Sequence, residues 1–128
     1  MKIKFIPNCF VISLFLLFVS FSSTQEEYTI DKWKKDECGC DRVRTVPFAE
    51  HLVNTYSLDK GKTHKEVIKV LGKPNKKQGT KAKLQFVYYI QTDCYKGKKA
   101  KDSLSWSELT IFFNENKKSC YFSLTAHG

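Results

Sequence analysis

Residues 63–74 read Thr-His-Lys-Glu-Val-Ile-Lys-Val-Leu-Gly-Lys-Pro, and this stretch carries start, face and stop signals of one helix. Thr63 followed by Glu66 predicts a capping box, in which the two residues satisfy free amide groups at the helix start. Gly72 favours the left-handed turn that ends a helix, and Pro74 prevents its continuation. Three apolar residues share one face: Val67, Ile68 and Leu71. The stretch therefore predicts a short amphipathic helix.

A second helix is predicted on the N-terminal side of the first. Pro47 suits the first turn of a helix, where the amide proton that it lacks has no partner anyway. Phe48, Leu52 and Tyr56 then recur at a spacing of four residues, which predicts a helix ending near Ser57.

Three strands are predicted after the helices. Residues 84–92 are rich in aromatic and branched side chains, and further strands are predicted at 108–113 and 118–125. Residues 74–83 and 93–106 are rich in lysine and predict connecting loops. The order of elements predicts an α+β fold, α-α-β-β-β, with two N-terminal helices packed on one face of a three-stranded antiparallel sheet.

The last two predicted strands form a hairpin. The polar residues 114–117 tolerate a tight turn. Pairing of Asn114 with Lys117, the two ends of this turn, places Ile111 opposite Cys120. The same register places Leu109 opposite Phe122, so apolar side chains face each other across the ladder.

The N-terminus predicts export. Lys2 and Lys4 precede an apolar run at residues 9–19, and small polar residues follow, as in a cleavable signal peptide. The run has about half of the roughly 20 apolar residues that span a membrane. No cysteine directly follows it that could carry a lipid. We expect an exported protein, periplasmic or extracellular, that is not lipid-anchored and has no transmembrane segment when mature.

Length and composition limit the number of domains and the classes of partner of the mature chain. We expect the signal peptide at 1–24, an extended N-terminal arm at 25–45 and one domain at 46–128. The formal net charge of +9 falls to +7 without the signal peptide, and the excess is nearly all lysine. Nucleic-acid binding favours arginine, and only Arg42 and Arg44 are present, so we expect no nucleic-acid partner. The lysines predict a solvated surface that attracts acidic partners.

Four cysteines remain in the mature chain. In an oxidising compartment an even number predicts two disulfides, here among Cys38, Cys40, Cys94 and Cys120. Cys94 and Cys120 would lie about two strand spacings apart in the sheet, beyond disulfide reach. Cys38 and Cys40 are too close in sequence to pair, so each should bridge one sheet cysteine. The close pair also leaves open a structural zinc or redox protein, although we expect no metal or cofactor.

The signals of the central helix, followed by an aromatic strand and a hairpin, resemble those of the SmpA/OmlA family of outer-membrane assembly proteins. The resemblance covers the domain at 46–128 and rests on a signature of seven residues: Gly61, Thr63, Glu66, Val67, Leu71, Gly72 and Pro74. It implies two helices on a three-stranded sheet, an architecture similar to that of secreted β-lactamase inhibitor proteins. It further implies a periplasmic accessory to outer-membrane assembly, with a protein as its partner.

No constellation of catalytic residues is present in the sequence. The three histidines, His51, His64 and His127, have no serine motif or carboxylate pair spaced to accompany them. We therefore predict a non-enzymatic protein.

The aromatic residues of the strands predict a contact surface. Alternation places Tyr89, Phe112 and Tyr121 on the sheet face opposite the helices, where three aromatic rings form a candidate partner-binding patch. The alternative is that the N-terminal arm or the long loop at 93–106 partly covers this face. The partner would be an envelope-assembly component or, if the protein is a secreted inhibitor, a target enzyme.

Overall fold

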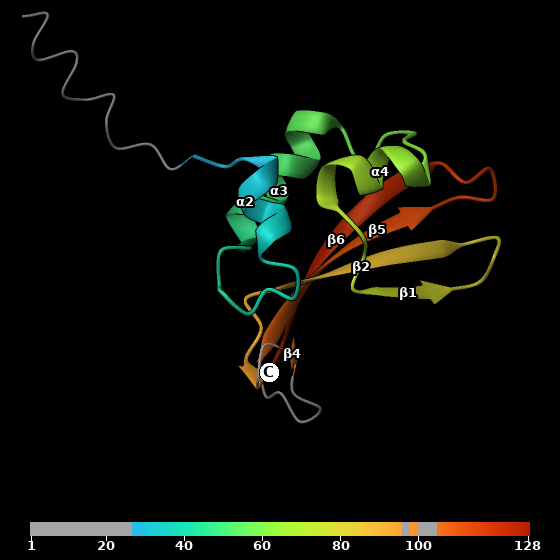
Figure 1. Ribbon diagram of the computed structural model, residues 1–128. Helices are drawn as coiled ribbons and strands as arrows, with labels where there is room; N and C mark the ends of the chain where they lie inside the picture. The colour runs from blue at the N-terminus through green and yellow to red at the C-terminus, as the bar shows by residue number, and fades with distance from the viewer. Residues whose placement is uncertain (1–26, 96–97, 100–104) are drawn as a thin grey trace, which may run out of the picture.

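A computed structural model describes residues 27–95, 98–99 and 105–128 (Figure 1). Its elements form an α+β fold, which confirms the predicted class. The helices are α2 (Ile30–Lys35), α3 (Val46–Tyr56) and α4 (His64–Leu71). The strands are β1 (Lys76–Gly79), β2 (Leu84–Ile90), β3 (Cys94–Tyr95), β4 (Lys98–Lys99), β5 (Trp106–Phe113) and β6 (Ser119–His127).

The predicted count of two helices and three strands is wrong. The described residues contain three helices and a four-stranded antiparallel sheet in the order β1-β2-β5-β6, with a separate two-stranded ribbon of β3 and β4. The two additional main elements, α2 and β1, lie in segments that were predicted to be extended arm and loop. The signal peptide predicted at 1–24 lies outside the described residues.

Helix α2 forms in the predicted arm because its few residues have both a cap and a core contact. The side chain of Thr29 accepts a hydrogen bond from the amide of Lys32 at the helix start. Trp33 is completely buried, and its indole Nε1 donates to the carbonyl of Leu71 at 3.1 Å. Its ring also meets that of Phe48 edge to face. One large aromatic residue therefore converts a charged segment into part of the core.

Helices α3 and α4 match their predicted positions. Thr45 caps α3 by accepting from the amide of Phe48. In α4, Thr63 and Glu66 form the predicted capping box, and Gly72 has a φ of 79° at the helix end. These local signals need no distant partner, which explains why they could be read from the sequence.

Strand β1 forms within the predicted loop 74–83. It pairs antiparallel with β2, and Gln78 lies opposite Gln85 with a 2.7 Å hydrogen bond between the two side-chain amides. Lysine and glycine have low strand propensity. The pairing with β2 therefore stabilises this strand, rather than its own composition.

The predicted register of the last hairpin is wrong by two residues. Ile111 pairs with Phe122 and Leu109 pairs with Leu124. One residue of the shift arises at the turn, which is one residue longer than predicted. The amide of Asn114 donates to the carbonyl of Lys118, whereas the predicted turn paired Asn114 with Lys117. The other arises from a β-bulge after the Phe112 pair, where Cys120 is the extra residue. A shift of two residues leaves the paired side chains on their predicted faces. Cys120, predicted to face the core, is the exception, because the bulge leaves it exposed.

The helices lie together on one side of the sheet, above β2 and β5 in Figure 1. Between these layers lies one continuous core. It is formed by apolar residues from every described helix, from the turn after α3 and from the two central strands: Trp33, Phe48, Ala49, Leu52, Val53, Leu58, Val67, Val70, Leu71, Phe86, Tyr88, Ile90, Leu109, Ile111 and Phe113. Among the described residues, no helix is long and apolar enough to cross a membrane.

Candidate functional site

The sheet face opposite the core, here called the open face, carries two separate groups of aromatic residues. In the strand register, Phe112 lies between Gln85 and Tyr121, whereas Tyr89 pairs with Glu108. Tyr89 is four residues further along β2 than Gln85, a distance of about 13 Å at the usual rise per residue. We call the Phe112 and Tyr121 region the hairpin end and the Tyr89 region the arm end. The predicted patch of three aromatic residues is therefore divided between two ends.

At the hairpin end, two aromatic rings stack across neighbouring strands. The ring centroids of Phe112 and Tyr121 are 4.1 Å apart and the planes differ by 10°. Tyr121 remains 53% exposed, the largest exposure among the exposed large apolar residues of the described chain. Because β6 is an edge strand, the second face of the Tyr121 ring is directed away from the sheet.

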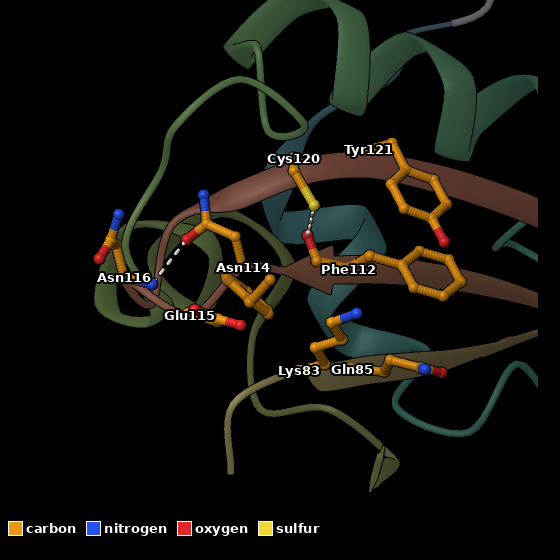
Figure 2. A pocket seen from close by; sticks show the side chains of 9 residues that line it. Lys83, Gln85, Phe112, Asn114, Glu115, Asn116, Cys120 and Tyr121 are labelled. Atoms are coloured by element: carbon orange, nitrogen blue, oxygen red, sulfur yellow. Dashed lines mark hydrogen bonds between the residues drawn. The ribbon is translucent and has the colours of Figure 1, made fainter. Parts of the chain in front are cut away.

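A hollow adjoins this stack (Figure 2). It has a volume of about 510 Å³ and is lined by the stacked rings and by polar side chains that include Lys83, Gln85 and Asn116. The Cys120 thiol also lines it, with Sγ 3.3 Å from the carbonyl oxygen of Phe112. The hollow therefore has an apolar floor with amide, ammonium and carboxylate groups around it, a composition that is typical of binding sites.

At the arm end, the segment around Gly39 packs directly on β2. The amide of Thr92 donates to the carbonyl of Gly39, and a Cβ built at Gly39 would lie 2.7 Å from the carbonyl oxygen of Tyr89. Burial, with the nearby Glu108 carboxylate and Cys38 thiol, raises the pKa of Tyr89. The arm therefore contacts β2 at the arm end, where Tyr89 is half-buried.

Three further residues gather at the arm end that sequence reasoning did not identify as a group. Trp106 and His127 stack with ring centroids 4.5 Å apart. Glu108 accepts from the Trp106 indole at 2.9 Å through one oxygen, and its other oxygen lies 3.5 Å from Nε2 of His127. Alternation along the strand places Trp106 and Glu108 on one face, but only the register shows that His127 joins them.

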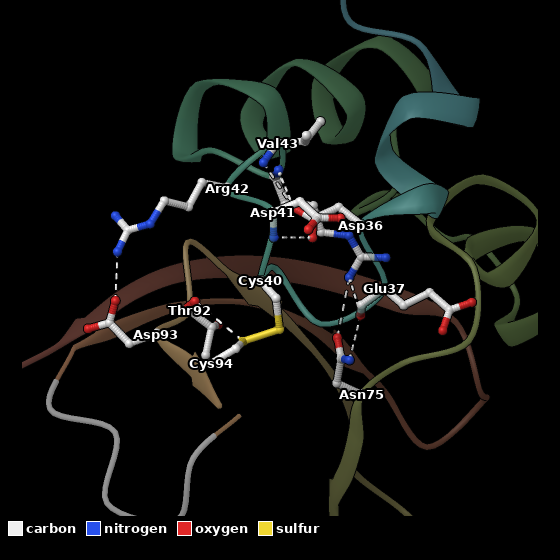
Figure 3. The surroundings of a disulfide bond; sticks show 11 residues. Asp36, Glu37, Cys40, Asp41, Arg42, Val43, Asn75, Thr92, Asp93 and Cys94 are labelled. Atoms are coloured by element: carbon white, nitrogen blue, oxygen red, sulfur yellow. Dashed lines mark hydrogen bonds and ion pairs between the residues drawn. A yellow bond between two sulfur atoms is a disulfide. The ribbon is translucent and has the colours of Figure 1, made fainter. Parts of the chain in front are cut away.

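One of the two predicted disulfides is present. Cys40 of the arm is bonded to Cys94, with the Cα atoms 5.5 Å apart (Figure 3). The prediction of a second bridge from the arm to the sheet is wrong, because Cys38 and Cys120 are both free thiols. Cys120 occupies the bulge at the hairpin end, whereas Cys38 lies in the arm beside the arm end. Within the described residues, no group of three or more potential metal ligands occurs.

Buried polar groups hold the arm in place beside the disulfide (Figure 3). The Asp36 carboxylate accepts from the backbone amides of Asp41, Val43 and Arg44, each at 3.0 Å. Arg44 is 2% exposed, and it donates to the carbonyls of Trp33 and Glu37. Burial lowers the pKa of Arg44, and the nearby Asp36 carboxylate opposes that shift.

The seven signature residues lie around α4 and serve its structure. Gly61 has a φ of 72°, and its amide bonds the carbonyl of Ser119. Val67 and Leu71 are fully buried. The other four residues form the helix cap and its termination: Thr63, Glu66, Gly72 and Pro74. None of them lines the hollow at the hairpin end.

His64 occupies a distinct apolar position at the start of α4. Its ring lies 4.3 Å from that of Phe113 and 5.1 Å from that of Phe86, measured between centroids. Burial, together with Lys117 and Lys77, lowers the pKa of His64. His51 contacts Tyr28 on the helical side. The three histidines therefore lie in separate places and form no joint site.

Comparisons with models of protein families, with curated proteins and with solved structures found no match for this chain.

Proposed function

We propose that this protein is an exported, non-enzymatic interaction domain that binds a protein partner through the hairpin end of its open face. The observation that carries the proposal is the Phe112 and Tyr121 stack, which is apolar, rigid and more than half exposed at Tyr121. Tyrosine combines a large contact area with a polar tip and is enriched at the centres of protein interfaces.

The position of the stack supports this use. Its two residues come from paired strands, so the backbone ladder holds the rings, and little side-chain freedom is lost on binding. The adjoining hollow can receive a side chain of the partner, and its rim offers hydrogen-bonding groups.

Electrostatics favours an acidic partner. Lys83 lines the hollow, and Lys117 and Lys118 are exposed at the nearby turn, so these three ammonium groups outnumber the one carboxylate of the lining, Glu115. None of these three lysines forms an ion pair among the described residues. Unpaired lysines attract an acidic protein over several ångströms and accelerate its association at low salt.

The proposed location rests on two features of the chain. The N-terminal order of charged, apolar and small polar residues is that of a signal peptide. The Cys40–Cys94 disulfide is compatible with an oxidising compartment. The resemblance to SmpA/OmlA proteins makes an envelope-assembly component our first choice of partner, and a target enzyme of a secreted inhibitor is the second.

The test compares two exposed tyrosines on opposite sides of the molecule. A photoreactive amino acid is placed at Tyr121 or at Tyr56, which is 41% exposed at the end of α3, and the protein is irradiated in its native source. We expect a protein adduct from position 121 and none from position 56.

The recovered partner then allows affinity to be measured. Tyr121→Ala is expected to weaken binding about fivefold or more, whereas Tyr56→Ala leaves it unchanged. Normal binding by a folded Tyr121→Ala protein would contradict the proposal, as would adducts that form only from position 56.

A further inference from the structure

The two edges of the main sheet differ in how they are protected against pairing with another strand. Strand β1 at one edge has four residues, and two of them are Lys76 and Lys77. Strand β6 at the other edge has nine residues, and no formally charged residue lies between Ser119 and Ala126. Natural sheets block their edges with short strands and lysines. The β1 edge has both of these features, and the β6 edge has neither.

Among the described residues, backbone hydrogen bonds to the outer edge of β6 occur only where the strand begins. Ser119 donates to the carbonyl of Lys62 and accepts from the amide of Gly61, both at 2.8 Å. From Tyr121 to His127, the only described strand that pairs with β6 is β5 on its inner side. Backbone amides and carbonyls along this outer edge therefore remain available, and an extended strand is the structure that satisfies them as a row.

We propose that β6 pairs antiparallel with β6 of a second copy of this chain, forming a two-fold symmetric dimer with a continuous eight-stranded sheet. Because the contact of Ser119 with the 61–62 loop occupies one end of the edge, the two-fold axis lies close to Leu124. This arrangement goes beyond the proposed function and does not require it.

Charge and symmetry favour a second copy of this chain over another protein as the strand that pairs with the outer edge of β6. A neutral strand opposite an identical strand places no like charges across the ladder, despite the positive charge of the whole chain. Pairing of β6 with β1 of the next molecule would propagate into a fibre, but the lysines of β1 disfavour it. Pairing of β6 with β6 closes after two copies. Both Phe112 and Tyr121 stacks then lie on one continuous face.

The first test uses the mature chain without any substitution. Analytical ultracentrifugation over a wide concentration range should show a monomer–dimer equilibrium. Hydrogen exchange at the same concentrations should show backbone amides within 121–127 that become protected as dimer forms, with no such change in β1. A monomer at every concentration would overturn the proposal, and so would a dimer whose β6 amides exchange unchanged.

The second test introduces like charges at the axis. Ser123 and Thr125 lie on the open face, so Ser123→Lys with Thr125→Lys adds charge without opening the core. This variant should raise the dimer dissociation constant about tenfold or more, since like charges opposite each other oppose pairing. The control, Asn54→Lys with Ala82→Lys, adds the same charge at exposed positions outside β6 and should dimerise normally.

The outcomes separate this inference from the proposed function. A folded β6 variant that dimerises like the control would overturn the β6 pairing, whatever the partner experiment shows. Should the variant lose its fold by circular dichroism, the exchange experiment on the unsubstituted chain decides. The proteins used in the two dimerisation tests all keep Tyr121. Loss of partner binding by the separate Tyr121→Ala variant therefore bears only on the proposed function.

Discussion

At the arm end of the open face, a disulfide fastens residues 38–44 to β3, and the buried Arg44 side chain fastens them to the end of α2. At the hairpin end, Phe112 and Tyr121 are held by strand pairing. Both ends carry aromatic residues on the same face. The difference is that an additional segment lies over one of them, so Tyr89 is half-buried and Tyr121 is exposed. Exposure of an aromatic residue on a sheet face therefore depends on distant segments that pack over it, and alternation along the strand does not reveal it.

The largest effect is expected from removal of the disulfide at the arm end. The cysteines are 54 residues apart, and release of a loop of that length destabilises the fold by about 4 kcal/mol through the entropy of the unfolded chain. Cys40→Ala with Cys94→Ala should lower the free energy of unfolding by that amount in urea denaturation.

The free cysteine at the hairpin end provides the control for removal of the disulfide. Cys120→Ala removes an exposed thiol at the hairpin end and should leave the unfolding transition nearly unchanged. Equal losses from the two substitutions would show that the disulfide does not distinguish the arm end.

Removal of the buried arginine should have the next largest effect. Arg44→Met removes a hydrogen bond to each of the carbonyls of Trp33 and Glu37, and it leaves the buried Asp36 carboxylate without the nearby guanidinium charge. Loss of one partner from a buried charged network costs about 3 kcal/mol or more. Thermal and urea unfolding of the variant would show this loss.

Arg42 is the matched control for Arg44, because it lies two residues away and is exposed. It forms a 2.6 Å ion pair with Asp93, in which the side chains are 65% and 50% exposed. Surface pairs of this kind contribute less than about 1 kcal/mol. Arg42→Met should therefore change stability little, and a loss as large as that of Arg44→Met would contradict the anchoring role.

Protonation of His64 probes the core beneath the hairpin end. Its pKa is lowered in the folded protein, so the unfolded chain binds the proton more tightly. Stability is then greatest above the ordinary histidine pKa of about 6.5 and falls as the pH drops through that value toward the folded pKa. His64→Gln should reduce this loss between neutral and acidic pH, measured by urea unfolding at each pH.

His51→Gln is the matched substitution, because it makes the same replacement at an exposed position on α3 and leaves His64 in place. The loss of stability between neutral and acidic pH should therefore persist in this variant. If His64→Gln leaves the pH dependence unchanged, other groups cause it and the His64 ring is not disfavoured as a cation.

The features that sequence reasoning identified correctly are local. Helices α3 and α4 have their cap, apolar face and stop within a dozen residues, and the strong propensity of residues 84–90 indicates β2 by itself. By contrast, β1 forms because it pairs with β2. Trp33 is part of the core because its indole bonds the carbonyl of Leu71 and its ring packs on Phe48, both distant in sequence.

The same distinction between local and distant determinants explains which features of the candidate site could be predicted. Phe112 and Tyr121 were both placed on the open face by alternation, and the stack confirms that they are neighbours. Their separation from Tyr89 depends on the pairing of β2 with β5, which places Phe112 opposite Gln85 and Tyr89 opposite Glu108. No register was predicted for that pair of strands. The identity of the disulfide partner, Cys40 rather than Cys38, depends on how the arm crosses β2, and no spacing in the sequence encodes that path.

The smallest effect on stability is expected at the hairpin end itself. Tyr121→Ala removes a ring that is half in solvent and loses chiefly its stacking on Phe112, so the cost should stay within about 1 kcal/mol. Tyr89→Ala at the arm end should cost more, because the Tyr89 side chain is half-buried and its removal leaves space there. Parallel urea denaturation of the two variants measures this order directly. If Tyr121→Ala were the more destabilising of the two, the hairpin end would be serving the fold, and its exposed ring would no longer indicate a surface kept for a partner.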